Sequence, residues 1–132
     1  MSVNVRPSPI AGTWYEGDPK ALARSVDSYM DAAQLPELDG EVIGAIAPHA
    51  GHLYSGPVAG YAFAALRGLE PGVVAVLSPF HNYQSAPLLT TAHDAYATPL
   101  GAVPVDRDRV AALTKALKSE LGFGLTALAL ES

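Results

Sequence analysis

"EVIGAIAPHAGHLYSGPVAGYAFAALRGLEPGVVAVLS", residues 41–78, is the stretch that decides the fold. It opens with the short apolar run 41–47 and closes with a second run, 72–78, and each run is followed by a proline. Between the runs, apolar residues recur at helical spacing from about Pro57 onward. Strand, helix and strand in this order form a βαβ unit with a right-handed crossover. The second run is apolar throughout, which suits burial on both faces of a parallel sheet. We therefore predict an α/β fold, a three-layer type with a mainly parallel or mixed sheet flanked by helices.

The chain before this stretch carries a helix signal. Residues 5–19, "VRPSPIAGTWYEGDP", are rich in proline and glycine and contain the only tryptophan, so we expect an ordered but irregular arm. Asp18 is a good N-cap, and Pro19 suits the first helical position. A helix is therefore predicted from Pro19 to the turn-rich segment 34–40, "QLPELDG".

The chain after the stretch mixes strand and helix signals. Residues 88–92, "LLTTA", are a candidate third strand, and residues 98–106, "TPLGAVPVD", are rich in turn formers. Either Asp106 or Asp108 is expected to cap a final helix. A new apolar segment, Leu125–Leu130, then begins close to the last residue. Since domains seldom finish on a strand that has just started, we expect this chain to be one part of a larger fold.

Composition limits the classes of function. The 132 residues show no repeat or linker, so we expect one domain, 1–132, although an incomplete one. The net charge is −5 and the eight basic residues are scattered, which argues against nucleic acid and anionic membranes as partners. There is no cysteine, which excludes disulfides and thiolate ligands within the chain. The N-terminus lacks an apolar leader, and a cytoplasmic location is the default expectation.

Two histidines follow the two apolar runs. His49 lies two residues after the first run and His81 three residues after the second. Ligands of open α/β sheets bind outside the carboxyl ends of the strands, and neighbouring strands are about 4.8 Å apart. Both imidazoles can therefore converge on one metal ion. The alternative is that each is a hydrogen-bonded loop residue, because the spacing matches no established metal motif.

Other polar residues near His49 are candidates for a ligand pocket. His52 is a candidate substrate contact or proton donor, or else an exposed residue at a helix start. Tyr54 and Ser55 are candidates for a polar pocket, with capping of the next helix as the favoured role of Ser55. His93 with Asp94 offers another imidazole and carboxylate, but a solvated turn is the preferred interpretation.

Four motifs, in order, resemble those of a known family. They are "RPSPIAGTWY" (6–15), "IAPHAGHLYSGPVAGYAFAAL" (46–66), "SPFHNYQSAPLLTT" (78–91) and "YATPLGAVPVD" (96–106). Together they resemble the MEMO family, also called the AmmeMemoRadiSam system protein B family. That family is similar in fold to class III extradiol dioxygenases, which cleave catechol-type rings with non-haem iron.

The resemblance implies roles for particular residues. His49 in "PHAG" and His81 in "SPFH" correspond to metal ligands of the family, so both are expected to be catalytic and to bind a divalent metal. Iron is the expected metal, with copper and zinc as alternatives. His52, Tyr54 and Ser55 are then expected to contact substrate.

The chain also departs from the family pattern. His52 stands where members usually carry an aromatic residue, and Ser78 precedes Pro79 where a glycine is common. Family domains are about twice this length, so a later acidic-histidine motif and a cysteine ligand would lie beyond Ser132. A facial triad needs two histidines and a carboxylate, so a third ligand has to come from elsewhere.

Three hypotheses about function follow. The first is a metal-dependent oxidoreductase of the extradiol-dioxygenase type with an unknown small-molecule substrate. The second is a non-catalytic binding or scaffold module for a peptide ligand. The third is an inactive half-domain that self-associates or needs a complementary C-terminal half.

Overall fold

The computed structural model describes residues 3–129. The chain divides into two compact units. One unit is the continuous segment Pro9–Glu70, and the other combines the N-terminal residues up to Ser8 with the chain from Pro71 onward.

Two helices build the Pro9–Glu70 unit: α1 (Pro19–Asp31) and α2 (His52–Ala64). The predicted cap of α1 is confirmed, because the Asp18 carboxylate accepts a hydrogen bond from the backbone N–H of Ala21 at 2.8 Å. Pro19 follows at the first helical position, where its missing N–H costs no hydrogen bond.

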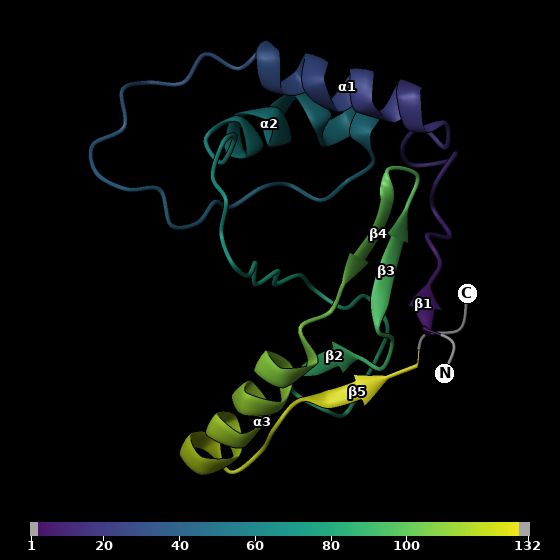
Figure 1. Ribbon diagram of the computed structural model, residues 1–132, viewed down its shortest axis with the longest axis vertical. Coiled ribbons are helices and arrows are strands. Elements are labelled where there is room, and N and C mark those ends of the chain that lie inside the picture. Colours follow the sequence, from purple (N-terminus) through teal and green to yellow (C-terminus); the bar gives the residue numbers. More distant parts are fainter. Residues whose placement is uncertain (1–2, 130–132) are drawn as a thin grey trace. The chain divides into compact units, whose positions relative to one another are not determined.

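The two helices pack closely against each other (Figure 1). Gly56 and Gly60 of α2 face Tyr29 of α1. A Cβ at Gly60 would collide with the backbone carbonyl of Tyr29, and one at Gly56 would collide with its ring. The glycines therefore permit the approach of the two backbones. Beyond α2, the guanidinium of Arg67 pairs with two carboxylates of α1, those of Asp27 and Asp31.

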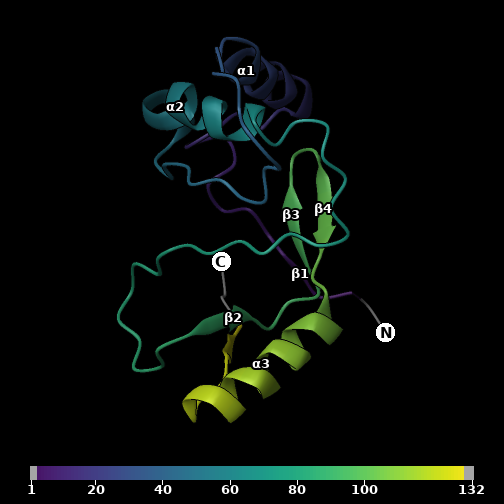
Figure 2. The same ribbon diagram turned by 90° about the vertical axis from the view of Figure 1, so that its left-hand side faces the viewer.

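The other unit contains a three-stranded sheet in the order β1–β3–β4. β1 (Val5–Arg6) runs parallel to β3 (Ala95–Thr98), which forms an antiparallel hairpin with β4 (Gly101–Pro104) (Figure 2). The segment that the sequence marks as turn-rich thus contains a strand. Gly101 has φ = +131°, a conformation that favours glycine.

A second sheet in the same unit pairs β2 (Leu89–Thr91) in parallel with β5 (Thr126–Leu128). The predicted third strand is confirmed as β2. The last apolar segment contains β5, although Leu130 lies outside the described residues. α3 (Arg107–Leu121) connects β4 to β5.

The start of α3 is well defined. Asp106 is its N-cap and accepts a hydrogen bond from the backbone N–H of Arg109 at 3.0 Å, so of the two predicted caps Asp106 takes this role. The Arg107 guanidinium donates to the carbonyl oxygens of Thr91 and Ala92, which ties the helix to the end of β2.

The predicted strands at 41–47 and 72–78 are not formed in this structure, and this part of the prediction is wrong. Within residues 3–129 neither run pairs with another strand. Ile46 is 99% exposed and Leu77 is 91% exposed. A strand is stable only when its N–H and C=O groups find a ladder partner. The predicted βαβ unit is consequently not formed among the described residues, while the three helices and two sheets found there confirm the coarser α/β class.

The helix predicted from Pro57 begins five residues earlier, at His52. Pro57 therefore lies inside α2. Proline lacks the N–H that a helix interior normally donates to the carbonyl four residues before it, so it removes that hydrogen bond. The described part of the chain contains no helix that is both long enough and apolar enough to cross a membrane.

Candidate functional site

Two hydrogen bonds fix the "PHAG" loop where it leads into α2. The backbone N–H of His52 donates to the carbonyl of Trp14 at 2.9 Å, which ties the helix start to the N-terminal arm. The buried hydroxyl of Ser55 donates to the carbonyl of Ala50 at 2.8 Å. Since Ala50 follows His49 directly, Ser55 fixes the backbone next to the candidate ligand.

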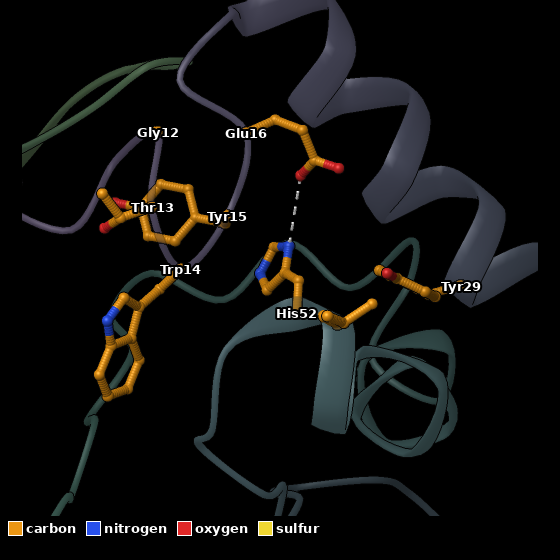
Figure 3. Close-up of a pocket in the computed structure, with 8 residues that line it drawn as sticks. Gly12, Thr13, Trp14, Tyr15, Glu16, Tyr29 and His52 are labelled. Atoms are coloured by element: carbon orange, nitrogen blue, oxygen red, sulfur yellow. Dashed lines mark ion pairs between the residues drawn. The ribbon is translucent and has the colours of Figure 1, made fainter.

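A pocket of about 300 Å³ lies where the arm meets both helices (Figure 3). All of its lining belongs to the Pro9–Glu70 unit. The arm contributes five consecutive residues, α1 contributes one and α2 contributes two: Gly12, Thr13, Trp14, Tyr15, Glu16, Tyr29, His52 and Leu53.

A carboxylate and an imidazole face each other in this pocket. Nδ1 of His52 lies 3.8 Å from Oε2 of Glu16 (Figure 3). The hydroxyl of Ser25 donates to the same oxygen at 2.9 Å. Two aromatic rings flank the imidazole. The Tyr15 ring lies 5.4 Å from it, centroid to centroid, and the Tyr29 ring meets it edge-on at 6.1 Å.

The electrostatics of the pair are set mainly by Glu16. The pKa of Glu16 is lowered from its ordinary value of 4.5. The largest cause is a hydrogen bond from its own backbone N–H, followed by the hydrogen bond from the Ser25 hydroxyl and, to a smaller degree, by the charge of His52. The carboxylate is therefore charged at neutral pH. Nδ1 of His52 is buried and has no hydrogen-bond partner within the described residues. The Glu16 carboxylate lies within ion-pair distance of Nδ1 but beyond hydrogen-bond distance.

The residues predicted as substrate contacts lie in different environments. His52 lines the pocket, whereas Tyr54 is 81% exposed and is not among the lining residues. Ser55 is buried and uses its hydroxyl to hold the loop.

The predicted ligands belong to separate units. His49 is exposed in the Pro9–Glu70 unit, and His81 is exposed in the unit that continues from Pro71. Across residues 3–129, no three His, Asp or Glu side chains are grouped as metal ligands. The described residues therefore offer no complete donor set, and we assign no reaction step to a bound ion.

The solvated turn that the sequence suggests for His93 and Asp94 is confirmed only in part, because His93 is buried whereas the Asp94 side chain is 45% exposed in a bend. His93 is 8% exposed, and its Nδ1 lies 3.0 Å from the side-chain oxygen of Asn4. The Asp94 carboxylate accepts a hydrogen bond from the backbone N–H of Asn4 at 2.9 Å. These contacts join the N-terminal strand to the start of β3 and give the pair a structural role.

The sequence did not single out Glu16, Tyr15 or Tyr29 as pocket residues. The available signal was the cluster of one acidic and two aromatic residues in "TWYEG", residues 13–17. Their partner His52 is 36 positions from Glu16, a separation that no local pattern bridges.

Comparisons with known proteins agree with the motifs. Residues 6–126 match the Memo-like protein family. A MEMO1 family protein from Pyrobaculum aerophilum is 37% identical over 123 residues, which cover 88% of this chain and 44% of the relative. Relatives from Pyrobaculum arsenaticum and Methanothermobacter thermautotrophicus, also MEMO1 family proteins, are each 34% identical. The matches to these two cover 80% and 84% of this chain, and 40% and 43% of the relatives.

The chain thus spans less than half the length of the curated relatives that it matches. The family match nevertheless extends over nearly the whole chain, including the "PHAG" loop, the pocket and the "SPFH" loop. The resemblance seen in the motifs is confirmed, and the chain belongs to the Memo-like protein family.

Proposed function

We propose that this chain supplies two ligands, His49 and His81, to a divalent metal site of a Memo-like fold. Iron is the expected metal, and it would act as the redox centre of dioxygenase-type chemistry. Family membership over residues 6–126 carries the proposal, because it places both histidines within matched sequence. Imidazole nitrogen is a common ligand of iron, copper and zinc.

The local geometry around His49 supports this proposal. His49 is exposed, so its imidazole is accessible to a ligand. The next residue, Ala50, is held by the Ser55 hydroxyl, which limits the freedom of the loop. His52, three residues after His49 and at the start of α2, lines a pocket that also contains aromatic side chains. We propose that His52 contacts the substrate from the pocket, that the exposed Tyr54 contacts it from outside the pocket, and that Ser55 positions the loop.

Metal content is the decisive measurement. Protein purified anaerobically and reconstituted with Fe(II) is analysed by mass spectrometry, as wild type, His49→Ala, His81→Ala and Asn82→Ala. Asn82→Ala is the matched control, because Asn82 is exposed and directly follows His81. We expect metal in the wild type and in the control, and a loss of at least about tenfold in affinity in both histidine variants, because each loses one ligand. Wild-type protein without metal, or histidine variants with unchanged metal, would contradict the proposal.

The exposed apolar runs favour a second proposal, that the chain associates through them. Ile43 and Ile46 in the first run are at least 95% exposed, and Val76 and Leu77 in the second are at least 83% exposed. Exposed apolar segments with unpaired backbone are templates for strand pairing. We propose that they pair with further strands, either from a polypeptide that corresponds to the rest of the relatives' length or from a second copy.

Size-exclusion chromatography with light scattering tests the association. The chain is measured alone and after co-expression with the part of the Pyrobaculum aerophilum relative that lies outside the match. We expect a one-to-one complex in the second case and self-association in the first. A chain that stays monomeric at high concentration in both cases contradicts association.

A further inference from the structure

We propose that the pocket between the N-terminal arm and the two helices binds an organic ammonium group, held by the Glu16 carboxylate and by the rings of Tyr15 and Tyr29. The inference concerns only the Pro9–Glu70 unit and does not depend on the metal proposal.

The charge of the lining favours a cation. Among the eight lining residues, Glu16 is the acidic one and none is a lysine or arginine. The hydrogen bonds that lower the pKa of Glu16 keep it ionised at neutral pH. The chain as a whole carries a net charge of −5, which attracts cations and repels anions.

The hydrogen bonds of Glu16 leave room for a ligand. The Ser25 hydroxyl and the His52 imidazole both approach Oε2, and the backbone N–H of Glu16 is a further donor to the carboxylate. An ionised carboxylate offers about four lone-pair sites, so these contacts leave it able to accept from a ligand N–H. The Ser25 bond also fixes the orientation of the carboxylate. Glu16 remains about two-fifths exposed as a side chain, which a carboxylate needs in order to meet a ligand from solution.

The aromatic lining favours an organic cation over a metal ion. Faces of aromatic rings attract ammonium groups within about 6 Å of the ring centroid. The rings of Tyr15 and Tyr29 both line this pocket and lie near the ring of His52. A metal ion would instead favour several carboxylate or imidazole ligands, and the lining offers one carboxylate and one imidazole beside hydroxyl groups.

His52 is the internal competitor of such a ligand. Nδ1 lies 3.8 Å from the carboxylate, which is longer than a hydrogen bond, so the two groups are only loosely paired. The N-terminus of α2 itself favours an anion, but Glu16 already places one negative charge there. Binding of an anion is the alternative hypothesis, and the titration below tests it with benzoate.

The test is a ligand titration followed by NMR of the Trp14 indole N–H and the amides of residues 12–16. Benzylammonium is compared with benzyl alcohol, which has similar shape and no charge, and with benzoate. Nα-acetyl-lysine amide tests whether the ammonium of a lysine side chain is also accepted. We expect saturable shifts with one or both ammonium probes, and at least roughly tenfold weaker binding of benzyl alcohol and benzoate. Equal binding of benzylammonium and benzyl alcohol, or preference for benzoate, overturns the proposal.

Variants locate the site. Glu16→Gln removes the charge and keeps an oxygen that accepts the Ser25 hydroxyl, so we expect folded protein and roughly tenfold weaker ammonium binding. Glu37→Gln makes the same change at an exposed position outside the pocket and should leave binding unchanged. His52→Phe removes the competitor, and binding should be retained or tightened. Unchanged binding in Glu16→Gln would overturn the proposal even if benzylammonium binds.

Discussion

Glu16 shows how a single residue acquires a role from distant partners. Its own backbone N–H and the Ser25 hydroxyl hold the carboxylate, and His52 approaches it from the start of α2. The sequence indicated His52 as a candidate contact, yet nothing near Glu16 in the chain marked this residue. Pairing of side chains 36 positions apart depends on how the arm packs against the start of α2, which local patterns do not encode. The Asp18 cap, whose acceptor and donor are three residues apart, was predictable for the opposite reason.

The Ser25 bond leads to a prediction on the pKa of Glu16. Ser25→Ala removes one of the two hydrogen bonds that lower this pKa, so the pKa should rise toward 4.5. An NMR titration of the Glu16 carboxyl carbon measures it. Ser28→Ala is the control, because Ser28 is exposed on the same helix. An unchanged Glu16 pKa in Ser25→Ala would show that the hydroxyl does not stabilise the carboxylate.

The same bond predicts a pH dependence of stability. Because the pKa of Glu16 is lower in the folded chain than in the unfolded chain, its contribution to stability is present above the unfolded value. This contribution is lost as the pH falls through the folded value. Urea unfolding should therefore show a smaller acid-induced loss of stability in Ser25→Ala than in the wild type. An equal loss in both proteins would contradict this coupling.

At the scale of elements, small residues decide how closely the helices pack. Glycine to alanine inside a helix normally stabilises by about 1 kcal/mol. At Gly60 the new Cβ would meet the Tyr29 carbonyl of α1, so we expect Gly60→Ala to destabilise the protein by about 1–3 kcal/mol instead. Gly44→Ala is the control, because no atom lies within 4 Å of a Cβ there. Urea unfolding measures both variants, and a stabilised Gly60→Ala would show that the helices do not meet at this point.

The cap of α3 gives a second prediction at this scale. Asp106→Ala removes the acceptor for the backbone N–H of Arg109 and also its ion pair with the Arg109 guanidinium. We expect a loss of about 1 kcal/mol in the free energy of unfolding. Asp108→Ala, in the first turn, should cost less because Asp108 only complements the helix dipole. Equal effects of the two changes would contradict the assignment of the cap.

At the scale of the whole molecule, the sequence predicted the α/β class correctly but did not predict which strands pair. The segments 41–47 and 72–78 have strand-like composition, yet neither finds a ladder partner in the structure. β2 forms because β5, more than 30 residues later, pairs with it. Composition indicates which segments favour extended backbone, whereas partners from distant parts of a chain decide whether a sheet forms. The predicted metal site depends on these same two segments forming neighbouring strands, so local sequence patterns could not predict its geometry.

Amide hydrogen exchange at two protein concentrations tests whether these runs are unpaired until the chain associates. In dilute protein, residues 42–47 and 73–77 should exchange with little protection, because no backbone hydrogen bond joins either run to another part of the described chain. In concentrated protein their protection should rise as strands pair between copies, while protection of α1 should stay the same. Protection of both runs in dilute, monomeric protein would show instead that the βαβ unit forms within one chain, and the convergence of His49 and His81 would follow from it.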